Sequence, residues 1–182
     1  MTSRVDGLTP DEAGALDEDS FVRRFGGVYE HSPWAAREAW RRRPFDGFDD
    51  LARAFEAAVR EASEPARLAL VRAHPELAGR EAEVGELTDE SASEQAAAGL
   101  DRLSGEEAAR LRALNRDYRE KFGFPLVIAV REQNKASILA QGEARLRNGR
   151  EQELDAAIDQ IVEIARLRLR ELVTDSNRKE TT

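Results

Sequence analysis

The residues of this chain best suited to acid–base chemistry lie between positions 74 and 95. His74 is one of only two histidines, and histidine is the side chain whose ordinary pKa lies nearest neutrality. Pro75 disfavours helical geometry at His74, which turns the imidazole away from the helical hydrogen-bond ladder. A structural role is the alternative for any single His-Pro pair. The other histidine, His31, precedes Ser32-Pro33 and can simply cover the start of a helix.

Three polar residues follow at helical spacing. Ser91, Glu94 and Gln95 stand at i, i+3 and i+4, so on a helix they share one face. Ser-x-x-Glu is also a capping box, which would make these residues a helix start and nothing more. Thr88 offers an equally good start one turn earlier, and that start would leave the shared face free to meet a substrate.

The final helix contributes a candidate cation. At about 100° per residue, Arg168 lies roughly 65° from the centre of the apolar stripe, compared with roughly 95° for Arg166 and 135° for Arg170. Arg168 is therefore the arginine closest to the core. A buried guanidinium needs an anionic or carbonyl partner, which is either a structural carboxylate or a substrate group.

The run from Phe124 to Val130 is the only β-like segment of the sequence, and a single short strand does not form a sheet. We expect a buried extended segment whose backbone N–H groups need partners. These groups either bond neighbouring loops or point at the carbonyl and amide groups of a polar heterocycle. No phosphate loop, dinucleotide fingerprint or metal motif is present, and two histidines 43 positions apart make a weak case for a metal site.

Composition narrows the class of protein. The chain has 182 residues, no cysteine and a net charge of -8. The lack of cysteine excludes disulfides and thiol catalysis, and the acidic balance argues against nucleic-acid binding. No apolar stretch approaches the length of a membrane span, and the acidic N-terminus does not resemble a signal peptide. A cytoplasmic protein that does not contact membranes is expected.

Capping and stop signals divide the chain into helices. The expected helices begin at Thr9-Pro10, run from Ser32-Pro33 to Arg43 at the latest, and then cover 49–62, 65–73, 88–102, 104–122, 134–146 and 152–173. Gly79 and Gly85 bracket a polar loop. The prediction is an all-α, single-domain bundle of about eight helices with one buried extended segment, spanning residues 1–182 with a core at 9–174 and a polar tail at 175–182.

Taken together, these motifs resemble the 2-oxo-4-hydroxy-4-carboxy-5-ureidoimidazoline (OHCU) decarboxylase family of purine breakdown, from Phe21 to Val173. Each motif is weak alone, but their order and separations are specific. They are Phe25-Gly26-Gly27-Val28-Tyr29-Glu30-His31-Ser32-Pro33-Trp34, His74-Pro75-Glu76-Leu77, Ser91-x-x-Glu94-Gln95-x-x-x-Gly99-Leu100, Asn115-x-x-Tyr118-x-x-Lys121-Phe122-Gly123-Phe124-Pro125 and Leu167-Arg168-Leu169.

The resemblance implies an all-helical, cofactor-independent carboxy-lyase without a metal. Such an enzyme is usually a homodimer and converts a small molecule, the ureidoimidazoline, to (S)-allantoin. Whether it works in functional association with a hydroxyisourate hydrolase stays open on sequence. By the same resemblance the catalytic pair is His74 and Glu94. The implied substrate-binding residues are Pro75, Ser91, Gln95, Arg168 and the backbone of Leu126, Val127 and Ile128.

The sequence departs mildly from the family pattern. Leu126 stands where an aromatic residue is common, Glu76 where aspartate is common, and Glu132 where glycine is common. None of these changes removes an implied catalytic group, although each can alter packing or affinity.

Two other functions stay open on sequence alone. The apolar stripes of 111–122 and 154–172 could form the groove of a helical interaction module without catalysis. The same scaffold could also act as a decarboxylase or lyase of a related ureide.

Overall fold

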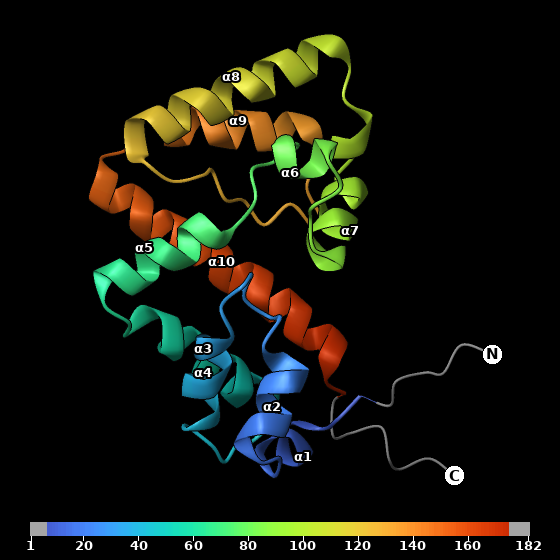
Figure 1. The fold of residues 1–182 in the computed structure, drawn as a ribbon, viewed down its shortest axis with the longest axis vertical. Helices are drawn as coiled ribbons and strands as arrows, with labels where there is room; N and C mark the ends of the chain where they lie inside the picture. The colour runs from blue at the N-terminus through green and yellow to red at the C-terminus, as the bar shows by residue number, and fades with distance from the viewer. Residues whose placement is uncertain (1–6, 175–182) are drawn as a thin grey trace, which may run out of the picture. The chain divides into compact units, whose positions relative to one another are not determined.

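The computed structural model describes residues 7–174, with the exception of the Glu81 side chain. Within this range the chain is all-α, as predicted, and its one β-type contact is an isolated parallel bridge between Leu8 and Val173 (Figure 1). The elements are α1 (Pro10–Gly14), α2 (Glu18–Phe25), α3 (Pro33–Trp40), α4 (Phe48–Arg60), α5 (Glu64–Ala73), α6 (Arg80–Glu83), α7 (Asp89–Ala97), η1 (Leu100–Arg102), α8 (Gly105–Phe122), α9 (Lys135–Arg145) and α10 (Arg150–Leu172).

The chain forms two compact units. Unit 1 is drawn from Met1–Leu70 and Val162–Thr182, and unit 2 is Val71–Ile161. Helices α5 and α10 each begin in one unit and end in the other. The prediction that residues 1–182 form a single domain stays a prediction, and the expected polar tail at 175–182 lies outside the described residues.

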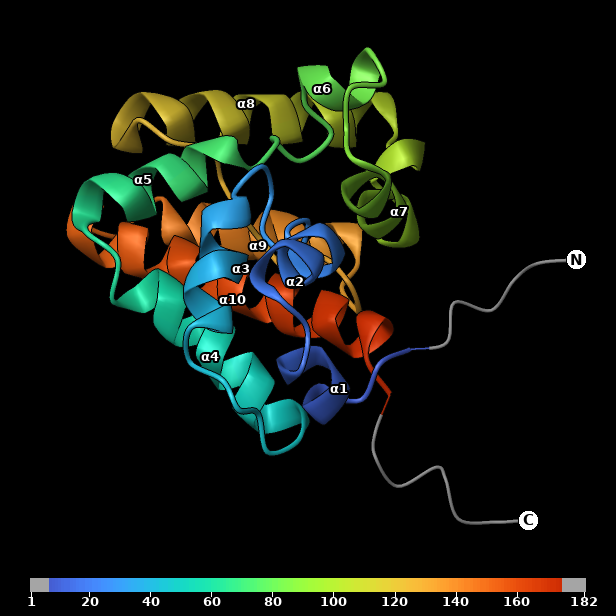
Figure 2. The same ribbon diagram turned by 60° about the horizontal axis from the view of Figure 1, so that its bottom comes forward.

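Unit 1 is built on aromatic packing. Helix α3 lies against α2 and α4 (Figure 2). Phe21 and Phe25, one helical turn apart on α2, place their ring centroids 4.6 Å from each other, and Phe55 of α4 lies 6.0 Å from Phe21. All three are fully buried, and burying each such ring contributes on the order of 1.5–3 kcal/mol. The Tyr29 hydroxyl donates to the Phe55 carbonyl at 3.0 Å, so the phenol is buried with its polar end satisfied.

Unit 2 is organised by α8 packed against α9 (Figure 1). Ser104 opens α8 with the predicted capping box, in which its side chain accepts from the Glu107 N–H at 3.2 Å. Gly123 ends α8 at a φ of 77°, a left-handed conformation that glycine adopts without steric cost. The chain then runs through residues 124–130, which are buried and lie outside any helix or strand. This segment matches the non-helical buried segment expected from sequence.

Three local features differ from expectation. Helix α2, capped by Asp17, was not separated from the preceding helix on sequence. A single helical turn, α6, lies inside the polar loop expected between Gly79 and Gly85. The helix expected to reach residue 102 ends at Ala97, because Gly99 takes a φ of 79° and only the 3₁₀ turn η1 follows. Between residues 7 and 174, eight helices have eight or more residues, α2–α5 and α7–α10, which agrees with the predicted number.

The apolar stripes of α8 and α10 belong to the interior of the molecule. Leu111, Leu114, Tyr118 and Phe122 are buried on α8, and the α10 positions from Leu154 to Leu169 that carry the stripe are mostly buried as well. The only exposed large hydrophobic side chain among the described residues is Val84. An open partner-binding groove along these stripes is therefore not supported. No helix in the described range is long and apolar enough to cross a membrane.

Candidate active site

His74 lies at the C-terminal end of α5, where the chain leaves the helix. Its N–H donates to the Val71 carbonyl at 3.2 Å in a last tight turn, and Pro75 then prevents the helix from continuing. The side chain is buried, with 6% of its surface exposed. A buried imidazole at a helix end is a favourable place for controlled proton transfer, because water does not compete for its nitrogens.

The loop after His74 is held in place by two amide side chains. The Gln95 Oε1 accepts from the Ala78 N–H at 2.7 Å, and its Nε2 donates to the Glu76 carbonyl at 3.4 Å. The Asn115 Nδ2 donates to the Leu77 carbonyl at 2.9 Å. Three consecutive residues of the loop are thereby bonded to α7 and α8, so the backbone that follows the imidazole is fixed.

Gln95 therefore has a structural role that sequence reasoning did not assign to it. It was singled out for substrate binding, and its amide is already bonded to the His74 loop. One Nε2 hydrogen remains after the bond to the Glu76 carbonyl, since a primary amide carries two donors. A substrate contact from Gln95 stays a prediction.

Helix α7 presents the polar face expected from its spacing. Thr88 is the N-cap, and its side chain accepts from the Ser91 N–H at 3.3 Å. The helix therefore starts one turn before Ser91, as the second of the two sequence interpretations proposed. Ser91, Glu94 and Gln95 are all buried on this helix, which is otherwise largely exposed. Polar residues gathered on the buried face of a helix are poor for packing and good for binding a polar ligand.

Glu94 has a cationic neighbour that sequence reasoning missed. The Arg131 Nη2 lies 3.5 Å from the Glu94 Oε1. Glu94 is buried and the Arg131 side chain is partly exposed, so the guanidinium offsets part of the cost of burying the carboxylate while keeping its own contact with water. The available signal was the position of Arg131, directly after the buried segment.

The backbone of residues 127–129 is held by three side chains. The Arg145 Nη1 donates to the Val127 carbonyl at 2.6 Å, the Gln160 Oε1 accepts from the Ala129 N–H at 3.0 Å, and the Gln133 Nε2 donates to the Ala129 carbonyl at 2.9 Å. None of these three side chains was identified from sequence as a partner of this segment.

Three backbone donors of this segment remain available. No group among the described residues accepts a hydrogen bond from the N–H of Leu126, Val127 or Ile128. All three residues are buried. Buried N–H groups are normally satisfied, and a run of three without a protein acceptor is typical of a site where a ligand supplies one.

Arg168 lies in unit 1, whereas His74 and Glu94 lie in unit 2. Its Nη1 donates to the Glu30 Oε2 at 3.0 Å and approaches the Val28 carbonyl at 3.5 Å. Both members of the ion pair are buried. The structural carboxylate considered from sequence therefore exists and is Glu30. A substrate contact from Arg168 stays a prediction.

The burial order of the α10 arginines agrees with the helical geometry. Arg168 is buried, Arg166 is partly exposed and pairs with Asp49, and Arg170 is exposed. The order is the one predicted from their angles to the apolar stripe.

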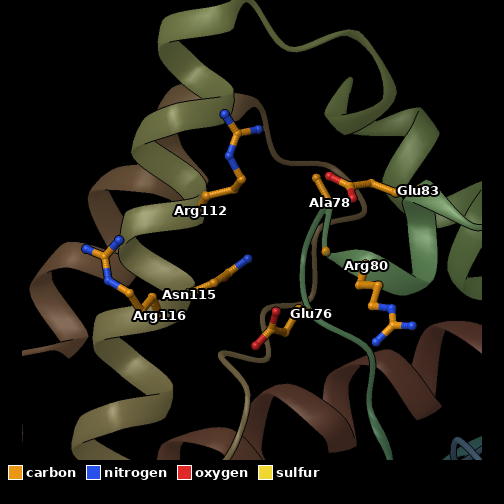
Figure 3. A pocket seen from close by; sticks show the side chains of 8 residues that line it. Glu76, Ala78, Arg80, Glu83, Arg112, Asn115 and Arg116 are labelled. Atoms are coloured by element: carbon orange, nitrogen blue, oxygen red, sulfur yellow. The ribbon is translucent and has the colours of Figure 1, made fainter.

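A hollow of about 300 Å³ is lined by residues of the loop after His74, of α6 and of α8. Figure 3 shows the Asn115 side chain projecting from α8 toward the loop that carries Glu76 and Ala78. Most of the charged residues around it, such as Arg80 and Arg112, are exposed. None of the predicted site residues lines this hollow, so we do not equate it with the candidate site.

The second histidine lies at the start of a helix. His31 is exposed and takes a φ of 48° just before α3, which agrees with a role at the start of the helix. Within residues 7–174, no group of three or more His, Cys, Asp or Glu side chains is arranged to hold a metal ion.

Comparison with known proteins places these features in a family context. The family model for OHCU decarboxylase matches residues 14–170. The chain is 45% identical, over 164 residues, to the 2-oxo-4-hydroxy-4-carboxy-5-ureidoimidazoline decarboxylase of Haloferax volcanii, an alignment that covers 90% of this chain and 95% of that protein.

Two longer proteins are also similar. A crystal structure of (S)-allantoin synthase superposes with a TM-score of 0.72 at 28% identity, covering 91% of this chain and 54% of that chain. The uric acid degradation bifunctional protein PucL of Bacillus subtilis is 33% identical over 92% of this chain, which corresponds to 33% of its own length.

Proposed function

Because the chain belongs to the OHCU decarboxylase family, we propose that it removes CO₂ from 2-oxo-4-hydroxy-4-carboxy-5-ureidoimidazoline and releases (S)-allantoin during urate breakdown. The observation that carries this proposal is the family match, which runs through residues 14–170 and so includes every candidate site residue from His74 to Arg168. The burial of His74 and Glu94 and the three available backbone donors in unit 2 support it from the structural side.

The proposed reaction needs no external electron acceptor. When the bond between the ring carbon and its carboxylate breaks, CO₂ leaves and the electron pair forms a double bond to the neighbouring ureido-bearing carbon. The electrons of the adjacent ring imine move onto nitrogen, which takes up a proton. The hydroxyl then loses its proton to become the ring carbonyl, and the ureido-bearing carbon accepts a proton. We therefore propose an enzyme that works without a metal or organic cofactor.

The protein must then provide orientation, charge stabilisation and a proton on one face. We propose that His74 forms a hydrogen bond with Glu94 and moves the proton at the substrate's hydroxyl or ring nitrogen. Arg131, 3.5 Å from Glu94, would hold that carboxylate in place.

The remaining site residues would hold the substrate. Ser91 and Gln95 on α7, Pro75 in the loop and Arg168 on α10 would contact its polar groups. The N–H groups of Leu126, Val127 and Ile128 would donate to the ring and ureido carbonyls, because a substrate carbonyl supplies the acceptor that these donors lack among the described residues.

The first test removes the proposed acid–base pair. His74→Ala and Glu94→Ala should each lower the rate of substrate loss by about 10² to 10⁴-fold, the usual contribution of general acid–base catalysis. The substrate is generated freshly with a uricase, and its decay is followed by circular dichroism. Uncatalysed decay gives racemic allantoin, so an active enzyme yields both a faster decay and a single enantiomer.

The matched control is His31→Ala, which removes the exposed second histidine and should retain the parental rate. Far-ultraviolet circular dichroism establishes that each variant is folded. Near-parental rates for both His74→Ala and Glu94→Ala would refute the assigned pair, and a parental protein that does not accelerate the decay would refute the function.

Three further proposals follow from the resemblance. We propose a homodimer, a cytoplasmic location and a functional association with a hydroxyisourate hydrolase. The last is supported by the Bacillus subtilis bifunctional protein, in which a segment similar to this chain is joined to further sequence. Light scattering tests the dimer, and a monomeric mass would remove it without affecting the catalytic assignment.

A further inference from the structure

The carbonyl of Val127 accepts a hydrogen bond from one buried guanidinium. Arg145 is the last residue of α9, and its Nη1 donates to this carbonyl at 2.6 Å. Val127 belongs to the backbone segment proposed to bind substrate, and Arg145 has no place in the acid–base chemistry described above. The contact links a residue outside the proposed site to the orientation of one peptide group within it.

The guanidinium of Arg145 is itself held by a buried polar network. Its Nε donates to the Glu153 Oε1 at 2.5 Å, and its Nη2 donates to the Tyr118 hydroxyl at 3.2 Å. The Tyr118 hydroxyl donates in turn to the Glu153 Oε1, and the Asn148 Nδ2 donates to the Glu153 Oε2 at 2.7 Å. Every nitrogen of the guanidinium has an acceptor, so its position is closely determined.

Planar peptide geometry transmits this position to the other side of the backbone. The peptide between Val127 and Ile128 is trans, since the one cis bond among the described residues precedes Pro44. In a trans peptide the C=O and the following N–H point in opposite directions. Holding the Val127 carbonyl toward Arg145 therefore aims the Ile128 N–H away from it, and this N–H has no acceptor among the described residues.

The peptide groups on either side of Ala129 are also held by hydrogen bonds. The Val127–Ile128 peptide therefore cannot rotate together with the peptide groups that follow it. The Ala129 N–H donates to Gln160 and its carbonyl accepts from Gln133. Arg145 and these two glutamines together hold three successive peptide groups of a segment that has no helical or sheet ladder of its own. Turning the Ile128 N–H would require breaking at least one charge-assisted bond.

We infer that Arg145, supported by Glu153 and Tyr118, is a positioning residue that aims the Ile128 N–H at the substrate. This inference rests on the proposed function, because it needs a substrate carbonyl at that N–H. A role in stability alone explains the network poorly, since a buried ion pair is often no more stabilising than apolar residues of similar volume. A donor fixed before the substrate arrives, by contrast, acts on the transition state without reorganisation.

The test separates positioning from folding by removing both charges together. Arg145→Met/Glu153→Gln leaves no uncompensated buried charge, and the glutamine amide can still accept from Tyr118. Arg145→Lys is the conservative variant, which keeps the charge beside Glu153 but loses the planar guanidinium that reaches three acceptors. Arg147→Met is the matched control, because Arg147 is exposed near the same end of α9.

In the double variant we expect kcat to fall by about 10-fold or more, while KM changes less than about 3-fold, as for the loss of a donor that acts mainly in the transition state. Arg145→Lys should lie between the double variant and the parent, and Arg147→Met should match the parent. In the parental protein the amide resonance of Ile128 should shift when (S)-allantoin is added, and this shift should be reduced in the double variant.

A folded double variant with parental kcat would overturn the inference, and so would an Ile128 resonance in the parental protein that does not respond to (S)-allantoin. The measurement of the Ile128 resonance needs no variant. It can therefore refute the inference even if the double variant does not fold. Failure of the proposed function is a different outcome, because the parental protein would then fail to accelerate substrate decay at all.

Discussion

At the residue scale, the polar residues between Asn115 and Pro125 resemble a family site motif but act mainly as anchors. Asn115 bonds the His74 loop at the Leu77 carbonyl, and Tyr118 bonds Glu153. Lys121 donates to the Leu146 and Asn148 carbonyls at 2.6 and 3.0 Å, where α9 ends. Each of the three side chains bonds a different segment: the His74 loop, α10 or the end of α9. The motif therefore links the segments that surround the proposed site.

Glu132 shows what a departure from the family pattern does locally. It stands where glycine is common and takes a φ of 69° on the surface. A side chain in this left-handed region costs roughly 1–2 kcal/mol, whereas the greater freedom of glycine in the unfolded chain costs roughly 0.5–1 kcal/mol. Glu132→Gly should therefore leave the free energy of unfolding unchanged or raise it by up to about 1 kcal/mol.

Urea denaturation measures this change, and Glu132→Ala is the control for loss of the charge. Glu132→Val should be destabilising, because a β-branched residue is least compatible with a positive φ. A glycine variant less stable than the parent by 1 kcal/mol or more, on the scale of these costs, would contradict the strain assigned to Glu132.

At the element scale, helix α9 approaches both α8 and the buried segment through a single glycine. A Cβ atom built on Gly142 would lie 2.6 Å from the Leu114 Cδ2 and 2.8 Å from the Leu126 Cδ2. Both distances are shorter than van der Waals contact. The close approach brings the end of α9, and therefore Arg145, to the Val127 carbonyl.

Gly142→Ala should destabilise the protein even though alanine is the better helix former. Overpacking lowers the free energy of unfolding by about 1–3 kcal/mol, whereas the better helix propensity of alanine raises it by up to about 1 kcal/mol. Thermal or urea denaturation measures the net loss. Gly105→Ala is the matched control, since nothing lies within 4 Å of its Cβ position in α8, and it should be neutral or stabilising. Equal stability of the two variants would show that α9 does not depend on this close approach.

At the scale of the whole molecule, each compact unit contains one of the two tyrosines of the chain. Burial raises the pKa of Tyr29 in unit 1. Burial also raises the pKa of Tyr118 in unit 2, and the hydrogen bond to Glu153 acts in the same direction. Both phenols are therefore kept neutral well above the ordinary value of 10.0.

This arrangement predicts the alkaline behaviour of the protein. A group whose pKa is raised by folding stabilises the folded state fully below its unfolded pKa, and this contribution is lost as pH rises above that value. The native protein should show no phenolate absorbance step near pH 10, and both tyrosines should ionise only as the chain unfolds at higher pH. Tyr29→Phe and Tyr118→Phe assign the signal to each unit. A normal step near pH 10 in the folded protein would contradict the burial of one or both phenols.

Much of the helical architecture was predictable because its signals are local. Helix ends are set by contacts within a few residues of each other. Examples are Ser104 with Glu107, Thr88 with Ser91, and Gly123 directly after Phe122. The burial order of Arg166, Arg168 and Arg170 follows from the helical repeat alone. The missed helix α2 and the single turn α6 are short elements, in which local signals are weakest.

Local patterns in the chain were enough to predict which residues are polar on buried helix faces, where most helices begin and end, and which family the motifs resemble. The partners of the buried charged groups became known only from the folded chain: Glu30 for Arg168, Arg131 for Glu94, and the Val127 carbonyl for Arg145. The reason is physical. Helical periodicity states that a side chain turns inward, but its partner comes from a segment distant in the chain, and only the packing of those segments brings the two groups within bonding distance.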